Sequence, residues 1–391
     1  MKKYKLGDIC EITSGSTPKT GVSEYWDGNS KWITPAELND DTYIITDSVR
    51  KITELAVKQT GLSPIPKGTV ILSSRAPIGK VAIAGCEMYC NQGFKNLICS
   101  EKIDNRYLYW FLKGNTEFLN SLGRGATFKE ISKSIVASIE INVPDLKEQL
   151  VVVENLEKIN RIITLRKKEL NELDNLIRAR FVEMFGEPQI NPFHWDVVNI
   201  SEVIGGKVSN GFFAKRDDYS DDGNVSVLGV ANIVNRMYSK VDELPKTNAN
   251  NKDIEKFEVK YGDMLFCRSS LVAEGIGKAS IVPEDVQDNV LFECHVIRLP
   301  LNLNKCVPEF IQTLSTMDFF RNQVVAQSKT ATMTTIGQDG ILKTDIILPP
   351  IEKQKEFYDF VKQIDKSKDS VQKALDEAQL LFDSLMQQYF G

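Results

Sequence analysis

The chain has 391 residues, enough for two or three domains. Hydrophobic residues make up 42% and charged residues 26%, a composition typical of a folded protein with substantial cores. The 48 Lys and Arg against 53 Asp and Glu give a net charge of −5, which argues against non-specific coating of nucleic acid. No apolar run is long enough to span a bilayer and no signal-peptide pattern opens the chain, so we expect a cytoplasmic protein.

The first 143 residues are predicted to form a globular block. Short apolar runs bounded by turn residues predict strands at 32–33, 44–45, 70–72, 81–84 and 97–98. A helix is expected over 107–122, followed by a polar loop at 123–129 and a closing strand over 135–143. Segment 65–99 holds Lys67, Arg75, Lys80 and Lys95 against Glu87, which is 4 − 1 = +3 in an acidic protein.

The next stretch, 144–186, is predicted to be one long helix, because apolar residues recur at heptad spacing between charged ones. A second block, 187–348, then repeats the order of elements of the first. We expect residues 195–202 at the start of this block to align with 4–11, and a strand to follow Gly262. A helix over 309–325, a polar loop at 326–332 and a closing strand at 345–348 complete it. Residues 349–391 predict a second long helix.

The two long stretches are copies of each other. A shift of 205 positions aligns 144–186 with 349–391 without a gap and places Pro144 on Pro349 and Gln149 on Gln354. We expect the helices to pair as an antiparallel coiled coil, which returns Gly391 to Met1. Two surface helices packed on separate blocks are the alternative. The predicted seam consists of Leu156, Ile159, Ile163, Leu170, Leu173, Ile177, Val361, Ile364, Val371, Leu375, Phe382 and Leu385.

The residues of common catalytic and metal sites are scarce. Seven cysteines occur without a CxxC pair, and a zinc site at Cys294-His295 lacks partners at suitable spacing, so we expect reduced, mostly buried thiols and no metal. No phosphate-binding GxxxxGK[ST] loop and no glycine-rich methyl-donor motif is present. Glu258-Val259-Lys260 matches the end of a nuclease motif, but no suitable Pro-Asp strand precedes it.

Several motifs in a fixed order carry a family resemblance. They are TSGSTPK at 13–19, SSRAPIGK at 73–80, NQGFK at 91–95, GDMLFCRSS at 262–270, EGIGK at 274–278 and TATMTTI at 330–336, with VPDLKEQ and LPPIEKQ at the helix starts. Together they make the whole chain resemble the specificity subunit of type I restriction-modification systems. The first block starts almost at residue 1, so we expect this chain to lack an N-terminal extension of that family.

The resemblance implies an α+β fold with a pseudo-two-fold internal repeat. Two similar α/β target-recognition domains, 1–143 and 187–348, would be separated by the helices 144–186 and 349–391. Each domain would read one half of a bipartite, gapped site in double-stranded DNA. The helices would set the gap and dock two methyltransferase subunits, joined by two motor-nuclease subunits in a restriction enzyme. The chain would perform no chemistry and need no cofactor, since S-adenosylmethionine would bind the methyltransferase, and no membrane would be involved.

Base reading requires polar and basic side chains presented on loops to the groove edges of DNA. Each candidate residue could equally be a solvated or structural side chain, and Arg75 and Arg268 could brace their own strands. The candidates are Arg75, Lys80, Asn91, Gln92, Lys95, Arg124, Thr127 and Lys129 in the first block, and Lys215, Arg216, Arg268, Ser269, Lys278, Lys329, Thr330 and Thr332 in the second.

Three other functions stay open on the sequence alone. The chain could be a coiled-coil scaffold that does not contact DNA, which an electrophoretic shift with its partner present would exclude. It could belong to a methylase-only system without a nuclease. It could also be an enzyme with an unrecognised site, which would require activity from the isolated chain.

Overall fold

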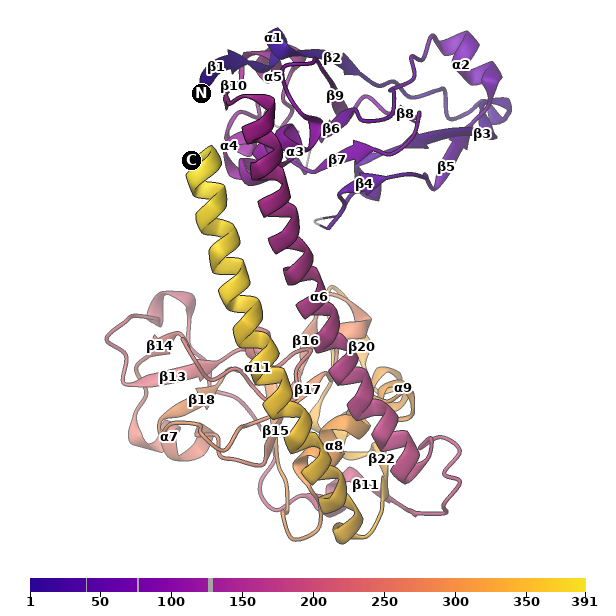
Figure 1. Ribbon diagram of the computed structural model, residues 1–391. Coiled ribbons are helices and arrows are strands. Elements are labelled where there is room, and N and C mark those ends of the chain that lie inside the picture. Colours follow the sequence, from indigo (N-terminus) through magenta and orange to yellow (C-terminus); the bar gives the residue numbers. More distant parts are fainter. Residues whose placement is uncertain (40, 76, 126–128) are drawn as a thin grey trace. The chain divides into compact units, whose positions relative to one another are not determined.

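The computed structural model describes residues 1–39, 41–75, 77–125 and 129–391 (Figure 1). The chain divides into two compact units. The first unit contains Met1–Lys167 and Lys373–Gly391, and the second contains Lys168–Gln372. The division falls inside both long helices rather than at their ends, because each half of each helix packs on a different block.

The first unit is built on a five-stranded sheet of order β2-β9-β6-β7-β4. A three-stranded sheet, β5-β3-β8, and the antiparallel pair β1-β10 complete it. The strands are β1 Lys2–Lys5, β2 Cys10–Ser14, β3 Trp26–Ile33, β4 Ile44–Ile45, β5 Arg50–Ile52, β6 Val70–Ser73, β7 Val81–Ala84, β8 Tyr89–Cys90, β9 Phe94–Cys99 and β10 Glu140–Val143. The expected strands at 32–33, 44–45, 70–72, 81–84 and 97–98 are all present.

The central strands of this sheet are buried on both faces. Val70 and Leu72 of β6 pack in one apolar cluster, with helix α3, while Ile71 packs in another, with Ile33 of β3. Successive residues of a strand point to opposite faces of the sheet. A strand that packs in an apolar cluster on each face therefore needs apolar residues at consecutive positions. The run VILS of β6 meets this requirement.

The second unit repeats the same topology. Its main sheet has the order β12-β19-β15-β17, and β14-β13-β18 and the pair β11-β22 correspond to the smaller sheets of the first unit. A further small sheet has the order β16-β21-β20. The strands are β11 Asp196–Asn199, β12 Ser209–Asn210, β13 Val225–Leu228, β14 Lys246–Thr247, β15 Asp263–Cys267, β16 Ser269–Ser270, β17 Ala279–Ile281, β18 Val290–Phe292, β19 Val296–Pro300, β20 Lys329–Thr330, β21 Thr334–Thr335 and β22 Asp345–Leu348.

Strand register fixes how the two units align. Tyr4 pairs with Ile141 and Val198 pairs with Ile346, so the shift is 198 − 4 = 194 at the start of each unit and 346 − 141 = 205 at its end. The expected alignment of 195–202 with 4–11 is therefore wrong by three positions. The identical letters Ile and Glu favoured it, but Leu6 and Ile200 are the residues whose amides donate to Ile139 and Thr344 at equivalent places.

The short helices depart from expectation at three points. The helices expected over 107–122 and 309–325 are each divided in two, at Asn115 and at Thr316-Met317. The first half of the strand expected over 135–143 is a helix, since the Ser132 side chain caps it by accepting from the Ile135 amide at 3.2 Å. The helices are α1 Leu6–Ile9, α2 Glu54–Thr60, α3 Asn105–Gly114, α4 Thr116–Ser121, α5 Lys133–Ser138, α7 Asn251–Phe257, α8 Pro308–Ser315, α9 Asp318–Ala326 and α10 Gln338–Leu342.

The two long helices are confirmed as α6 Leu146–Phe185 and α11 Ile351–Phe390. They run antiparallel in both units. In the first unit, Asn155 Nδ2 donates to Tyr389 Oη at 3.3 Å. In the second unit, the Lys368 ammonium lies 2.6 Å from Asp174 Oδ1. All twelve predicted seam residues are buried or half-buried. Tyr4 and Phe390 pack against one apolar cluster, so both ends of the chain belong to the first unit (Figure 1).

The repeated Pro-x4-Gln at each helix start has a structural role. Gln149 is fully buried, accepts from the Asp104 amide at 2.8 Å, and donates to the Pro144 carbonyl at 2.9 Å. Gln354 is equally buried, accepts from the Val307 amide at 3.0 Å, and donates to Pro349 at 2.7 Å. Asp104 and Val307 are the N-caps of α3 and α8. Each glutamine therefore joins a long helix to the short helix of its block.

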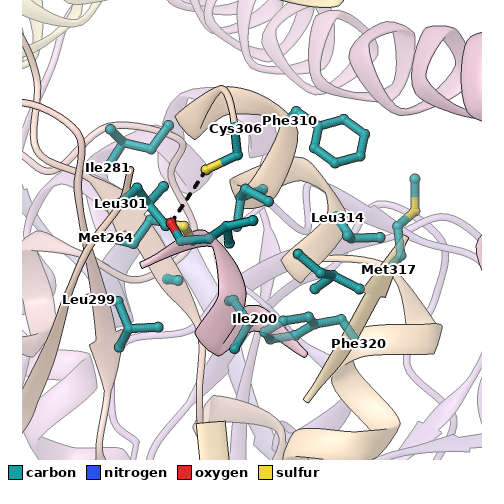
Figure 2. Packing of buried hydrophobic residues seen from close by; sticks show 14 of the residues in the cluster. Ile200, Met264, Ile281, Leu299, Leu301, Cys306, Phe310, Leu314, Met317 and Phe320 are labelled. Atoms are coloured by element: carbon teal, nitrogen blue, oxygen red, sulfur yellow. Dashed lines mark hydrogen bonds between the residues drawn. The ribbon is translucent and has the colours of Figure 1, made fainter. Parts of the chain in front are cut away.

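The main core of the second unit lies between the sheet and α8 and α9 (Figure 2). Met264 and Leu299 from the sheet pack with Phe310 and Leu314 of α8. Cys306 lies within this core and donates to the Val203 carbonyl at 3.8 Å (Figure 2). All seven cysteines are free thiols. No helix of the described residues is long and apolar enough to cross a membrane.

Candidate nucleic-acid interface

Predicted DNA-reading segments of the second unit meet in the small sheet β16-β21-β20. Ser269 pairs with Thr335, and Thr335 pairs with Lys329, so these three residues form one cross-strand row. Ser270, Thr334 and Thr330 form the neighbouring row, in which the Thr330 and Thr334 hydroxyls lie 3.0 Å apart. Residues directly opposite each other share a face of the sheet. We call the row Ser269, Thr335 and Lys329 the second strip.

The first unit has a strip at the equivalent place. Isolated bridges join Arg75 to Glu130 and Glu130 to Arg124. The shifts fixed by strand register place Arg75 on Ser269 (75 + 194), Glu130 on Thr335 (130 + 205) and Arg124 on Lys329 (124 + 205). We call Arg75, Glu130 and Arg124 the first strip. Segments far apart in the sequence thus form the same three-part row twice.

Charge in the first strip is organised by Glu130. Its Oε2 lies 3.0 Å from Arg75 Nε, and its Oε1 lies 3.4 Å from Lys95 Nζ. The Arg75 side chain is 46% exposed, whereas that of Lys95 is 6% exposed and also donates to Ser74 Oγ at 3.2 Å. Lys95 is therefore a buried support for the strip in this conformation, and Arg75 is the cation that faces solvent. Glu130 is shared between the two cations and is partly exposed to solvent, so these ion pairs orient Arg75 more than they stabilise the fold.

Four other candidates make hydrogen bonds within their own units, outside the strips. Lys80 Nζ donates to the Leu38 and Pro35 carbonyls, and Lys278 Nζ donates to Asn235 Oδ1 at 2.7 Å. Asn91 Oδ1 accepts from the Gly93 amide at 2.9 Å and shapes that turn. Arg268 Nη1 donates to the Cys294 carbonyl at 3.2 Å. The Lys80, Lys278 and Arg268 contacts each join two separate segments of their own unit, whereas the Asn91 contact is local to its turn.

The remaining candidates differ in their surroundings. Exposed Gln92 accepts from the Thr17 hydroxyl and so joins the TSGSTPK loop to the NQGFK turn. Lys129 is exposed beside Glu130, and Thr332 is exposed in the hairpin between β20 and β21. Lys215 and Arg216 lie at the 3-10 turn Arg216–Asp218, which packs on β14 rather than joining the second strip. Thr127 lies outside the described residues.

Two strip residues, Glu130 and Thr335, were absent from the predicted set. Glu130 directly follows the polar loop 123–129, and an acidic side chain is not one that the chemistry of base reading predicts first. Thr335 lies in the TATMTTI motif, of which the sequence-based candidates include Thr330 and Thr332 alone. The shift of 205 positions that aligns the long helices also aligns Glu130 with Thr335 (130 + 205). This alignment is the sequence signal that marks the two residues as equivalent positions.

The two cysteine thiols near the second strip are not activated as nucleophiles. Burial raises the pKa of two thiols here, those of Cys267, which precedes Arg268, and of Cys294, whose carbonyl accepts from Arg268. A raised pKa favours the neutral thiol over the nucleophilic thiolate. Within 1–39, 41–75, 77–125 and 129–391, no group of three His, Cys, Asp or Glu residues could hold a metal ion. The strips offer hydrogen bonds and charge, and both are means of binding.

Comparison with known proteins fits this architecture. The family described as "Type I restriction modification DNA specificity domain" matches residues 1–175 and 192–379. The chain belongs to this family. The two matched segments cover both blocks and most of both long helices, so the family accounts for the internal repeat.

Relatives and solved structures extend over nearly the full length. The MjaIX specificity subunit of Methanocaldococcus jannaschii is 29% identical over 92% of this chain and 85% of its own. The EcoKI specificity subunit of Escherichia coli K12 is 23% identical over 80% of this chain and 70% of its own. A type I S subunit from M. genitalium shares the fold with a TM-score of 0.54 at 13% identity, covering 100% of this chain and 96% of the other.

Proposed function

We propose that this member of the family is the DNA-recognition subunit of a type I restriction-modification complex. Each unit reads one half of a bipartite, gapped DNA site with its strip. The observation that carries the proposal is the pair of strips, which have equivalent positions and different side chains. Arg and Lys read guanine, and Ser and Thr bond to several base edges, so different rows read different half-sites.

The composition of the strips supports sequence reading over charge attraction. The first strip has two arginines and one glutamate, and the second has one lysine and two hydroxyl residues. The whole chain carries a net charge of −5, which gives little long-range attraction to phosphate. Partner subunits therefore supply much of the affinity, while this chain supplies discrimination.

The long helices are the proposed docking surface for two methyltransferase subunits. Large apolar side chains that neither the seam nor the blocks cover remain exposed on them within the first unit. Leu380 is 73% exposed, Leu165 53%, Leu381 51% and Ile162 46%. Exposed apolar groups on an otherwise charged helix are typical of a protein interface. S-adenosylmethionine and adenine methylation belong to the partner in this proposal, and motor-nuclease subunits join where the system restricts DNA. The chain itself is non-catalytic and acts in the cytoplasm, where its DNA lies.

Methylation-aware sequencing of host DNA tests the proposal. Deleting the gene should remove adenine methylation from one gapped, asymmetric sequence, and restoring it should return that methylation. Restoring the gene with Lys329→Ala should alter only one half of the site. An unchanged methylation pattern after deletion, with the methyltransferase still expressed, would count against a recognition role and favour a scaffold that does not contact DNA.

A further inference from the structure

A cavity of about 600 Å³ lies within the second unit, apart from the row that forms the second strip. Its wall includes Asp174 and Arg178 of α6, Asp365 of α11, Thr313 of α8 and Arg236 from the segment after β13. Pockets of a few hundred cubic ångströms are the size that holds small ligands.

Basic side chains from four separate segments face this cavity. None of Arg178, Arg236, Lys278 and Arg321 forms an ion pair within the described part of the chain. Arg178 and Arg236 are exposed at its rim, and their side chains make weak contacts: Arg178 Nη2 lies 3.9 Å from Met317 Sδ, and Arg236 Nε lies 3.4 Å from the Val234 carbonyl. Arginine forks that lack a carboxylate are suited to oxyanions.

Two buried polar atoms at the cavity lack partners. Thr313 is 2% exposed, and its hydroxyl has no hydrogen-bond partner among the described residues. Arg321 donates through Nη2 to the Glu274 carbonyl at 3.1 Å, but its buried Nη1 has no acceptor in the described chain. A buried polar group without a partner is costly, so both atoms require an acceptor that a ligand would provide.

The acidic residues on the cavity wall leave this positive character in place. Asp174 is already paired with Lys368 at 2.6 Å. Burial raises the pKa of Asp365 to about 6, so part of its population is neutral near pH 6. Asp365 and Asp369 are then the two acidic groups on the wall that oppose the four cations without a carboxylate partner.

We propose that this cavity binds a phosphate-bearing ligand. The rim guanidinium groups of Arg178 and Arg236 hold the phosphate oxygens, and Thr313 and Arg321 donate the inner hydrogen bonds. The phosphate belongs either to a free nucleoside polyphosphate or to a DNA backbone, and the second source rests on the proposed function. Lys278 belongs to both the cavity wall and the loop that follows the second strip, so either source is within reach of the same chain segment.

Isothermal titration of the full chain with sodium tripolyphosphate, in a buffer without phosphate, tests the proposal. Wild-type protein should bind one equivalent saturably. The double variant Arg178→Gln/Arg236→Gln should bind about a hundredfold more weakly, because each lost charge-assisted contact contributes about tenfold. Both side chains are exposed, so the fold should survive. Arg161→Gln/Lys355→Gln removes two exposed cations from the same long helices outside the cavity and should bind as wild type.

Absence of saturable binding to wild type, or equal affinity in the two double variants, would overturn the proposal. The source of the phosphate follows from a second arm, the affinity of the complex with its methyltransferase for duplex target DNA. If Arg178→Gln/Arg236→Gln lowers the affinity of the complex for DNA by the same factor as it lowers the affinity for tripolyphosphate, the phosphate belongs to DNA. Unchanged DNA affinity assigns the phosphate to a free ligand. Because tripolyphosphate binding is measured without DNA, its failure is distinct from a failure of target recognition.

Discussion

The first and second strips occupy equivalent positions in their units but carry different side chains. In the first strip, Glu130 holds Arg75 and Lys95 in a small ion-pair network. In the second strip, the matching centre is Thr335, flanked by Ser269 and Lys329, and no carboxylate occupies the row. The backbone ladder is thus independent of the side chains that it presents. A scaffold of this kind can change what it reads without changing how it folds.

A second contrast lies where each long helix meets its block. In the first unit, Arg106 of α3 lies 3.3 Å from Asp104 and 3.8 Å from Glu157 of α6. In the second unit, the matching residue of α8 is Glu309 (106 + 203), which is 1% exposed and accepts from the Tyr238 hydroxyl at 3.0 Å. In the first unit paired charges join α3 to α6, whereas in the second unit the equivalent side chain is a buried carboxyl with a raised pKa that is bonded to Tyr238.

The largest expected effect follows from this second contrast. Burial raises the pKa of Glu309 from 4.5 to about 7. Because the folded-state pKa lies above the unfolded value, the stabilisation is fully present below pH 4.5 and is lost as the pH rises through about 7. Glu309→Gln should therefore stabilise the protein at pH 9 by about 3 kcal/mol and have little effect at pH 5. Denaturant unfolding at the two pH values measures this difference.

Arg106→Gln is the matched variant in the first unit. It removes an ion-paired cation rather than a buried acid, so it should destabilise the chain and leave the alkaline loss of stability unchanged. A Glu309→Gln protein that still loses stability between pH 5 and pH 9 as wild type does would show that Glu309 is not the proton-holding group.

The next effect concerns the two buried glutamines. Gln149→Leu and Gln354→Leu each remove the acceptor of a buried N-cap amide, and each should lower the free energy of unfolding by about 2 kcal/mol. Gln149 makes a further hydrogen bond, to the Lys102 carbonyl at 3.0 Å, so its loss should be the larger. Thermal unfolding followed by circular dichroism measures both.

Gln363→Leu removes an exposed glutamine side chain from α11 and provides the control, with stability near that of wild type. Losses at Gln149 and Gln354 no larger than at Gln363 would mean that the repeated Pro-x4-Gln does not hold the helices to their blocks.

A smaller effect should separate the two strips. Lys329→Ala should weaken discrimination at one half-site by about 1 to 2 kcal/mol, and Arg124→Ala should do the same at the other half-site. Competition binding of the complex to duplexes with single base changes measures which half responds. Lys343→Ala, an exposed lysine just after α10, is the control. Loss at both halves from either variant would contradict independent reading by the two units.

The smallest effect concerns Glu130. Glu130→Gln releases Arg75 and Lys95 from their shared partner and should tighten non-specific DNA binding by less than about 1 kcal/mol, since the groups are partly exposed. The dependence of affinity on salt should become steeper, because one more cation is free to displace counterions. An unchanged salt slope would indicate that Arg75 remains held without the carboxylate.

The sequence by itself determined the repeat, the two long helices and most of the main strands. These features depend on local periodicity: heptad spacing in 144–186 and 349–391, and short apolar runs such as VAIA in β7. It also showed the family resemblance, because short motifs and their order along the chain can be recognised without the structure. Local signals misled where a cap decided the outcome, as at Ser132, which begins a helix inside an apolar stretch that otherwise predicts a strand.

Only the tertiary structure decided which polar residues act together. Glu130 and Thr335 became candidates because strand pairing places each beside a residue more than 50 positions earlier, Arg75 for Glu130 (130 − 75 = 55) and Ser269 for Thr335 (335 − 269 = 66). Lys95 and Arg75 read alike in the sequence, yet one is buried and the other exposed. Side-chain burial and pairing depend on contacts between distant segments, and local composition does not encode those contacts. The same reason kept the role of Glu309 hidden, since the burial that raises its pKa comes from segments distant in the sequence, including that of Tyr238, 71 positions earlier.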